Sequence, residues 1–310
     1  MDVPVVLVVG ATGRIGRSVL DHLSADQAAG RLRLAGLAHR SSGAEALAEA
    51  GIEARTLDLD RAELEGLGPV RAALRGVDRL FLLTGYDVRM MAHGKAVIDA
   101  AVAEGVGHIV HLGAHAARDT TVVHLGWHQL LEAYLEQSGP AFTHLHPTSL
   151  MQNLPMLFSL GGADPGLLPH PLGAGRQSWV HADDVAAVAA HVLRDPPRHA
   201  GEAYVLGAEN LSMPDIATLL AEVTGRPWRD EPRPPGEFLA KVTAAGADPV
   251  YMACVANIFR RVAEGSLPDL EQTSDTVRRL LGRPARTFRD YLEETRPIWE
   301  ASPSDLAAPA

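Results

Sequence analysis

Short apolar runs alternate with longer amphipathic segments through the first half of the chain. The apolar runs, several of them rich in Val and Ile, are residues 3–9, 33–38, 53–58, 79–84, 108–112 and 142–146. The segments in which apolar residues recur at spacings of three and four are residues 14–24, 44–50, 70–75, 94–104 and 127–137. These two periods predict strands and helices in alternation. Such an alternation is typical of a doubly wound α/β fold with a parallel sheet and right-handed crossovers.

The pattern becomes less regular after the sixth apolar run. Residues 150–176 contain several Gly and Pro and show no clear period. A strand and a helix are predicted again within residues 177–193, where Asp183 and Asp184 would provide the helix N-cap and the first-turn acids. A further short strand is expected at residues 203–206.

Helical patterns dominate the remainder of the chain. The clearest covers residues 213–224, with Ser212 as its N-cap and Gly225 as its stop signal. The other helical segments are residues 237–264, 275–281 and 288–299. Residues 301–310 are small, Pro-containing and aperiodic, which predicts a disordered tail.

We therefore expect two structural units. Residues 1–150 form a dinucleotide-binding Rossmann domain, to which residues 177–207 return. Residues 151–176 and 208–300 form a smaller, mostly helical part that binds the substrate. Residues 1–9 run directly into a glycine turn and carry no basic leader, so they predict a first strand and no secretory segment.

Composition narrows the classes of protein that fit. The net charge is −10, from 38 acidic residues against 28 Lys and Arg, and no basic tract is present, which argues against nucleic-acid binding. The apolar runs are shorter than the ~18 residues that span a bilayer, so no membrane association is expected. The single cysteine, Cys254, excludes an intramolecular disulfide and a cysteine-based zinc site. It lies in an apolar helical stretch, so we expect a buried thiol in a reducing cytoplasm.

The most informative motif follows the first predicted strand. Residues 9–16 read Val-Gly-Ala-Thr-Gly-Arg-Ile-Gly and lead into a helix. Gly10 permits the tight turn, Gly13 lets the backbone approach a pyrophosphate, and Gly16 lets the helix pack closely on the strand. The helix N-terminus then offers free N–H groups to the anion. The predicted cofactor contacts of this turn are Gly10, Thr12, Gly13, Arg14, Ile15 and Gly16.

The end of the second strand indicates which nucleotide binds. A site for NAD usually places an Asp or Glu there, whereas this chain has His39 and Arg40 followed by serines. A guanidinium binds a 2′-phosphate with two parallel hydrogen bonds, and a carboxylate would repel it. We therefore predict NADP(H); the alternative is that Arg40 is a solvated surface residue. Asp58 and Leu59 follow the third strand, as an adenine-edge contact or as a helix cap.

Several stretches, taken in order, resemble the NmrA-like branch of the atypical short-chain dehydrogenases/reductases. They are residues 10–16, 39–40, 80–84, 108–113, 132–154, 180–186 and 280–284. The resemblance implies a Rossmann domain with a small helical substrate domain. It also implies that Thr84, Gly85, Tyr86 and the Pro147-Thr148 pair line the nicotinamide. The substrate wall that it implies consists of Tyr86, Met151, Asn153, Met156, Leu157 and Phe158, with the helix around Met252 and Phe259.

The chain departs from the superfamily at its catalytic positions. Other members typically use a Ser after the fifth strand and a Tyr-x-x-x-Lys pair. In this chain the Ser position falls near Gly113, the Tyr position on His124 and the Lys position on His128. Only two lysines exist, Lys95 and Lys241, and neither lies in that segment. The Ser–Tyr–Lys mechanism is therefore not expected.

His124 and His128 are the candidate replacements, because they lie four residues apart on one helix face. Imidazole can act as acid or base near neutral pH, so His124 could protonate an oxyanion and His128 could contact the ribose. Glu132, one turn further, could orient His128. The alternative is that both are polar residues of a helix start. A metal site on this pair is not expected, because no third ligand can be named from the sequence.

Three functions remain open at this point. The first is NADPH-dependent reduction of a small hydrophobic, aromatic or quinone-like molecule, as in secondary metabolism. The second is a non-catalytic NADP(H) sensor that regulates a protein partner. The third is a non-redox cyclase or dehydratase that uses histidines as acid and base. A homodimer is compatible with each of them.

Overall fold

The computed structural model describes residues 3–158 and 166–300. Its centre is a seven-stranded sheet in the order β10-β6-β5-β4-β1-β2-β3, and every pairing in it is parallel. The strands are β1 (Val5–Val8), β2 (Arg33–Ala38), β3 (Glu53–Thr56), β4 (Arg79–Leu83), β5 (His108–Leu112), β6 (Ala141–Pro147) and β10 (Glu202–Leu206). The predicted parallel, doubly wound sheet is confirmed.

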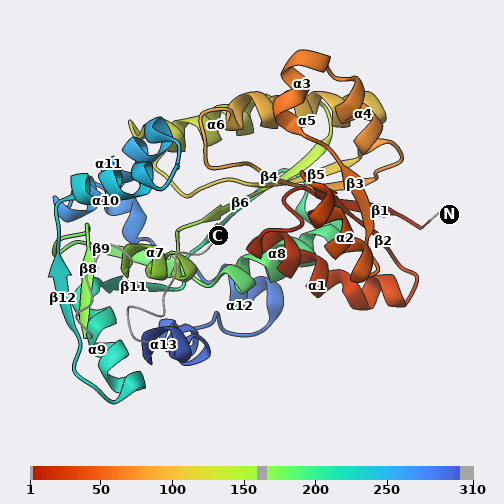
Figure 1. Ribbon diagram of the computed structural model, residues 1–310. Helices are drawn as coiled ribbons and strands as arrows, with labels where there is room; N and C mark the ends of the chain where they lie inside the picture. Colours follow the sequence, from red (N-terminus) through yellow and green to blue (C-terminus); the bar gives the residue numbers. More distant parts are fainter. Residues whose placement is uncertain (1–2, 159–165, 301–310) are drawn as a thin grey trace.

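Helices cover both faces of this sheet (Figure 1). They are α1 (Arg14–Ala28), α2 (Ser41–Glu49), α3 (Leu59–Glu65), α4 (Gly68–Leu74), α5 (Met90–Glu104), α6 (Val123–Glu136) and α8 (Ala182–Arg194). Val6 and Val8 of β1 pack under α1 and α8, whereas Val5 and Leu7 face the side of α4 and α5. Both faces of β1 are therefore buried, which explains its continuous apolar run.

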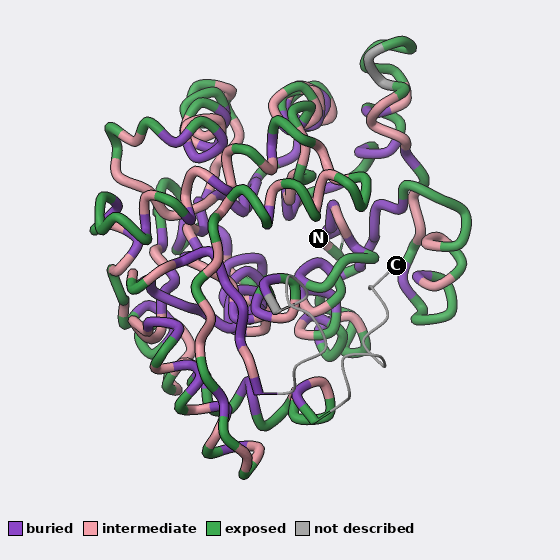
Figure 2. Tube along the Cα trace, turned by 60° about the vertical axis from the view of Figure 1, so that its left-hand side comes forward, coloured by how far each residue is buried: buried purple, intermediate pink, exposed green. Residues whose placement is uncertain are grey.

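Two smaller sheets lie beyond the carboxyl end of β6. One contains β7 (Ser149–Leu150), β9 (Arg176–Val180) and β11 (Glu209–Ser212), and the other pairs β8 (Leu167–His170) with β12 (Arg229–Pro232). Thus β9 joins a small sheet, while the next strand, β10, pairs with β6 in the central sheet. In Figure 2 the buried segments gather toward the inside of the molecule, and exposed segments lie toward its outside.

The helices of this second part pack on a separate apolar core that includes Trp179, Phe259 and Phe288. They are η1 (Met151–Asn153), α7 (Leu154–Phe158), α9 (Met213–Thr224), α10 (Pro235–Ala244), α11 (Pro249–Ala263), α13 (Phe288–Glu294) and α14 (Arg296–Glu300), with the short 3₁₀ turn η3 (Pro268–Glu271). Helix α12 (Thr276–Leu281) and the 3₁₀ turn η2 (Pro196–His199) instead lie against α8, and Val277 of α12 belongs to the core of the central sheet. Within the described ranges, no helix is both long and apolar enough to cross a membrane. The predicted tail at 301–310 lies outside the described residues.

The predicted bounds of α9 are confirmed. Ser212 forms a capping box with Asp215, and Gly225 ends the helix at φ +70°. The predicted N-cap of α8 is wrong: His181 caps this helix, because its Nδ1 accepts the Asp183 amide at 3.1 Å. Asp183 and Asp184 both lie in the first turn.

The single helical segment predicted over residues 237–264 is two helices. Gly246 adopts φ +94° between them, and Asp248 caps α11 by accepting the Tyr251 amide at 2.8 Å. Pro249 begins the new helix, a position where its missing N–H has no cost. Cys254 of α11 is half-buried and its thiol donates to the Val250 carbonyl at 3.3 Å, so its expected full burial is wrong.

Candidate functional site

The glycine turn joins β1 to α1 by the close approach that the sequence predicts. Gly10 adopts φ +71°, and its carbonyl accepts the Gly13 amide at 2.9 Å. A Cβ at Gly16 would lie 2.1 Å from the Gly10 oxygen, so only glycine lets α1 start this close to the turn. A Cβ at Gly10 would meet Leu83 Cδ2 at 3.1 Å, which places the turn beside the end of β4.

The start of α1 is bare, in the sense that it has neither a cap from a described side chain nor an acidic residue. Its N-cap is Gly13. The first amides of a helix have no partner within the helix and carry partial positive charge. Arg14 adds a guanidinium, which donates to the Gln152 carbonyl at 3.1 Å. Geometry and charge of this turn thus fit a pyrophosphate; the contacts of Thr12, Gly13 and Ile15 with it stay a prediction.

The first turn of α2 lies beside the glycine turn, since a Cβ at Gly43 would lie 3.0 Å from Thr12 Cγ2. Arg40 precedes α2, is exposed, and has no carboxylate partner among the described residues. The first turn of α2 also lacks acids. The charge at this point therefore fits a 2′-phosphate.

Asp58 has the capping role that was one of its two predicted alternatives. Its Oδ1 accepts the Asp60 amide at 3.0 Å at the start of α3 and lies 3.1 Å from His39 Nε2. Helix α3, which the sequence did not predict, begins at the next residue, Leu59. The adenine-edge contact of Asp58 and Leu59 stays a prediction.

Aromatic rings gather at the carboxyl edge of the sheet. Tyr86 follows β4 with a side chain 65% exposed, and its ring meets that of Tyr251 of α11 edge-on at 5.8 Å. The Tyr251 ring also lies 5.1 Å from His124 and 6.5 Å from Trp127, both on α6. Sequence reasoning missed Tyr251 and Trp127. The apolar spacing predicted that both residues lie in helices. It could not predict that α6 packs on α11, because that contact joins segments far apart in the sequence.

His124 and His128 are both buried on α6 and uncharged at neutral pH. Burial, followed by the neighbouring His128, lowers the pKa of His124 to about 4. Burial also lowers the pKa of His128 to about 4, although Glu132 opposes the shift. A neutral imidazole is a weak proton donor, so a role in proton transfer from an imidazolium would need a lower pH.

Glu132 does not orient His128 as expected. Its Oε1 lies 2.9 Å from His146 Nε2 and 3.8 Å from His111 Nδ1. The same oxygen would lie 2.4 Å from a Cβ at Gly113, near which the resemblance predicts the position of the superfamily's Ser. The carboxylate of Glu132 therefore fills the space that a side chain after β5 would need.

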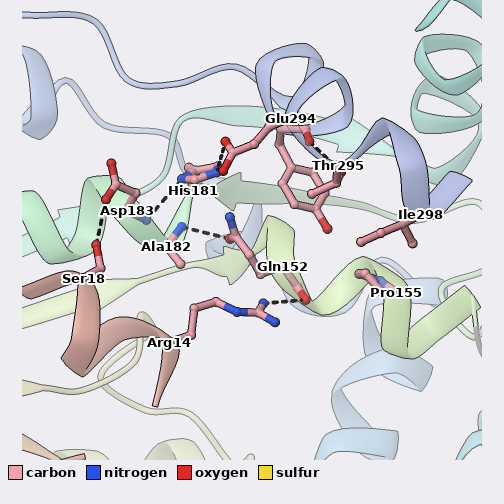
Figure 3. A pocket seen from close by; sticks show the side chains of 11 residues that line it. Arg14, Ser18, Gln152, Pro155, His181, Ala182, Asp183, Glu294, Thr295 and Ile298 are labelled. Atoms are coloured by element: carbon pink, nitrogen blue, oxygen red, sulfur yellow. Dashed lines mark hydrogen bonds and ion pairs between the residues drawn. The ribbon is translucent and has the colours of Figure 1, made fainter. Parts of the chain in front are cut away.

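A cavity of about 340 Å³ lies behind the glycine turn, between α1, α8 and α13 (Figure 3). Its walls include Arg14, Gln152, His181, Asp183, Tyr291 and Glu294. Gln152 Oε1 accepts the Ala182 amide at 2.9 Å, and Ser18 donates to Asp183 at 2.7 Å. This cavity was not predicted, because residues from four distant segments form it.

Comparison with known proteins decides the family. The model of the NmrA-like family matches residues 3–292. The chain belongs to the NmrA-like family. A relative named NAD(P)H azoreductase, from Xenophilus azovorans, is 33% identical over 289 residues, which cover 92% of this chain and 96% of the relative. A (4-alkanoyl-5-oxo-2,5-dihydrofuran-3-yl)methyl phosphate reductase from Streptomyces griseus is 32% identical and covers 93% and 97%.

Solved structures of similar fold include the Citrobacter sp. triphenylmethane reductase complexed with NADP(H), with a TM-score of 0.78 and 23% identity. That likeness covers 93% of this chain and 99% of the other. An NADPH-dependent quinone oxidoreductase from Escherichia coli, complexed with NADPH, has the same TM-score and identity and covers 94% and 99%.

The residues of the substrate wall that the NmrA-like resemblance implied differ in burial. Met151 is completely buried in the second core, where Leu157 also lies, and their contact with a substrate stays a prediction. Asn153 is exposed, and the side chain of Phe158 lies outside the described residues. Thr84, Gly85 and Pro147 stay as predicted contacts at the ends of β4 and β6.

Proposed function

We propose that the protein is an NADPH-dependent reductase of flat aromatic or quinone-like molecules that works without a Ser–Tyr–Lys triad. The observation that carries the proposal is the position of the bare start of α1. It lies beside the end of β4, where a Cβ at Gly10 would meet Leu83 and the ring of Tyr86 meets that of Tyr251. An anion site and an aromatic surface thus meet at one edge of the sheet, which is where ligands bind in open α/β sheets.

NADPH, when bound, supplies the hydride. The amides of the first turn of α1 would hold its pyrophosphate, and Arg40 its 2′-phosphate. Two of the matched proteins support a nicotinamide cofactor, because one is an NAD(P)H azoreductase and the other an NADPH-dependent quinone oxidoreductase. The charge pattern around Arg40, with no acid at the start of α2, favours NADPH over NADH.

The aromatic cluster of Tyr86, Trp127, Tyr251 and His124 would bind the acceptor. Rings that meet edge-on leave a face open to a flat ligand, and Tyr86 is mostly exposed. Neutral His124 can donate a hydrogen bond to a carbonyl or azo nitrogen, which orients the acceptor without a strong acid. Quinones and cationic dyes accept hydride readily, so such orientation is enough for reduction.

The neutral state of His124 and His128 weakens the cyclase or dehydratase alternative, which needs an imidazolium as acid. The sensor alternative differs from the reductase in one measurable respect, which is turnover. The test follows NADPH absorbance with a panel of a naphthoquinone, a triphenylmethane dye, an azo dye and an aromatic ketone. Turnover on at least one acceptor is expected, and tight NADPH binding with no turnover on any would overturn the reductase in favour of a sensor.

Variants of the aromatic cluster sharpen this test. Tyr251→Ala should raise the KM for the acceptor about fivefold while the affinity for NADPH stays unchanged, because one ring contributes on the order of 1 kcal/mol. Tyr134→Ala is the control, since Tyr134 lies near the C-terminal end of α6 and contacts Lys95 and Asp99 of α5. Equal effects of the two substitutions would remove the aromatic cluster from the substrate site.

A further inference from the structure

A group of histidines lies buried between the sheet and α6. His111 of β5 and His144 of β6 are direct neighbours in the parallel register, and their rings are 5.5 Å apart at 87°. Helix α6 covers this face and contributes Glu132 and His128. The register therefore brings together residues from three elements that are distant in the sequence.

The ring nitrogens of His111 and His144 are buried and poorly paired. His111 is 0% exposed and His144 is 2% exposed, and neither ring makes a well-formed hydrogen bond to a described group. Two carboxylates lie within ion-pair reach: Glu136 Oε1 is 3.4 Å from His144 Nε2, and Glu132 Oε1 is 3.8 Å from His111 Nδ1. Buried polar atoms are nearly always paired, because an unpaired one costs on the order of 1–3 kcal/mol. Two buried imidazoles that make no well-formed hydrogen bond, beside the Glu132 carboxylate, form a place where a ligand absent from the protein chain would satisfy the ring nitrogens.

The donor atoms point to a metal ion as that ligand. We propose that His111, Glu132 and His144 bind one divalent transition-metal ion, with Zn²⁺ as the best match. Among the described residues this is the one group of three such donors in which the ligand atoms all lie within 4.8 Å of one another. Zn²⁺ binds imidazole nitrogen and carboxylate oxygen at about 2.0–2.2 Å, so the site must contract by roughly 1 Å through side-chain rotation.

The surroundings suit an ion of this kind. His128 of α6 brings another imidazole close to the group, because its ring centroid lies 5.8 Å from that of His111. His146 bonds the Oε1 of Glu132 at 2.9 Å and fixes the carboxylate from behind, the arrangement expected around a metal ligand. Two nitrogen donors and one oxygen donor favour Zn²⁺ or Co²⁺ over Mg²⁺ and Ca²⁺, which prefer oxygen alone.

A second histidine pair in the chain lacks these features. The rings of His191 and His199 lie 5.2 Å apart, yet His199 Nδ1 is bonded to the Tyr204 hydroxyl at 2.8 Å. No carboxylate of the described chain completes a three-donor group there. This pair is therefore the internal control. The proposal does not depend on the reductase activity, because an ion in this site would tie β5 and β6 to α6 whatever the protein catalyses.

The test is metal binding by the untagged full chain, first stripped with a chelator. Zn²⁺ titration should show one tight site per chain, and Co²⁺ should give the visible absorption of a bound, low-coordinate ion. Glu132→Gln and His144→Gln should each weaken Zn²⁺ binding at least tenfold, whereas His191→Gln should leave it unchanged. Zn²⁺ and Co²⁺ should raise the Tm of the wild-type chain, and Mg²⁺ should not.

Two results would overturn the site. One is a wild-type chain that neither binds Zn²⁺ nor gains Tm from it, a measurement that stands even if a variant fails to fold. The other is tight Zn²⁺ binding that survives both substitutions, which would place the ion elsewhere. Loss of NADPH turnover with metal binding intact would concern the proposed function and leave this site standing.

Discussion

Helices α1 and α8 pack against each other but begin with opposite chemistry. The first turn of α8 carries Asp183 and Asp184, and His181 caps it. Asp183 also accepts hydrogen bonds from Ser18 and His22 of α1, and the bond to His22 lowers its pKa. Helix α1 begins at Gly13 without cap or acid. The start of α8 thus satisfies its own amides and stabilises the fold, whereas the start of α1 leaves its amides for a ligand.

The largest effect is expected from a substitution that prevents the close approach of Gly16 to Gly10 at the start of α1. Gly16→Val should abolish NADPH binding and lower the Tm by many degrees, because the Cβ would lie 2.1 Å from the Gly10 oxygen and the helix start would have to move. Nucleotide titration and thermal unfolding measure both effects. Gly236→Ala is the control, since a Cβ there meets nothing within 4 Å. Normal NADPH affinity in Gly16→Val would show that α1 does not hold the cofactor.

A subtler change makes α1 begin as α8 does. Gly13→Asp places a capping carboxylate on backbone that suits it, at φ −82° and ψ 168°. We expect NADPH affinity to fall on the order of 100-fold through repulsion of the pyrophosphate, while the Tm changes little. The reciprocal variant, Asp183→Asn, should lower stability and leave NADPH affinity intact. If the two variants behaved alike, the helix starts would not differ in role.

The third prediction concerns the phosphate at the end of β2. Arg40→Ala should weaken NADPH binding about 10-fold to 100-fold, the usual value of a charge-assisted hydrogen-bond pair. Binding of NADH should not change, because NADH lacks the 2′-phosphate. Parallel titrations with the two cofactors measure the difference, and an equal loss for both would assign Arg40 a structural role.

The smallest predicted effect concerns the pH dependence of stability, and it comes from the amino end of β5, away from the carboxyl edge of the sheet. His108 begins β5, bonds the Thr143 hydroxyl at 2.9 Å, and burial lowers its pKa to about 4. The unfolded chain protonates this residue near its ordinary pKa of 6.5, so acid favours unfolding and stability falls as the pH drops from 6.5 toward 4. One such group contributes about 1 kcal/mol between pH 6.5 and about pH 5.5.

Denaturant unfolding at several pH values of the wild type and of His108→Asn measures this contribution. In the variant, the number of protons taken up on unfolding should be smaller by about one, so its stability should depend less on pH. It should keep its affinity for NADPH, because His108 lies far from the carboxyl edge. An unchanged pH slope would show that His108 titrates alike in the folded and unfolded chain.

How much of the fold could be predicted from the sequence depends on whether the deciding residues are neighbours in the chain. The continuous apolar run of β1 and the Ser212 and Gly225 signals of α9 are local, and the structure has both where expected. The break at Gly246 was missed, because helical spacing continues on both sides of it. The α8 cap was misassigned because acids are commoner caps than His181, and only the structure shows which side chain reaches the free amide.

Predictions for the site divide in the same way. The glycine turn depends on neighbouring residues, so its geometry followed from the sequence. Tyr251 reaches His124 only because α11 packs on α6, and His111 meets His144 only through the strand register. Glu132 was assigned to His128 by helical spacing, but its carboxylate turns toward His146 on the sheet. Long-range packing therefore decided each of these contacts.

The most direct test of the central claim is the ratio of the Kd values of NADH and NADPH for the unmodified chain, measured by titration in one buffer. The bare start of α1 together with Arg40 predicts one nucleotide per chain and NADPH at least tenfold tighter than NADH. Equal affinities, or no binding of either cofactor, would contradict the account.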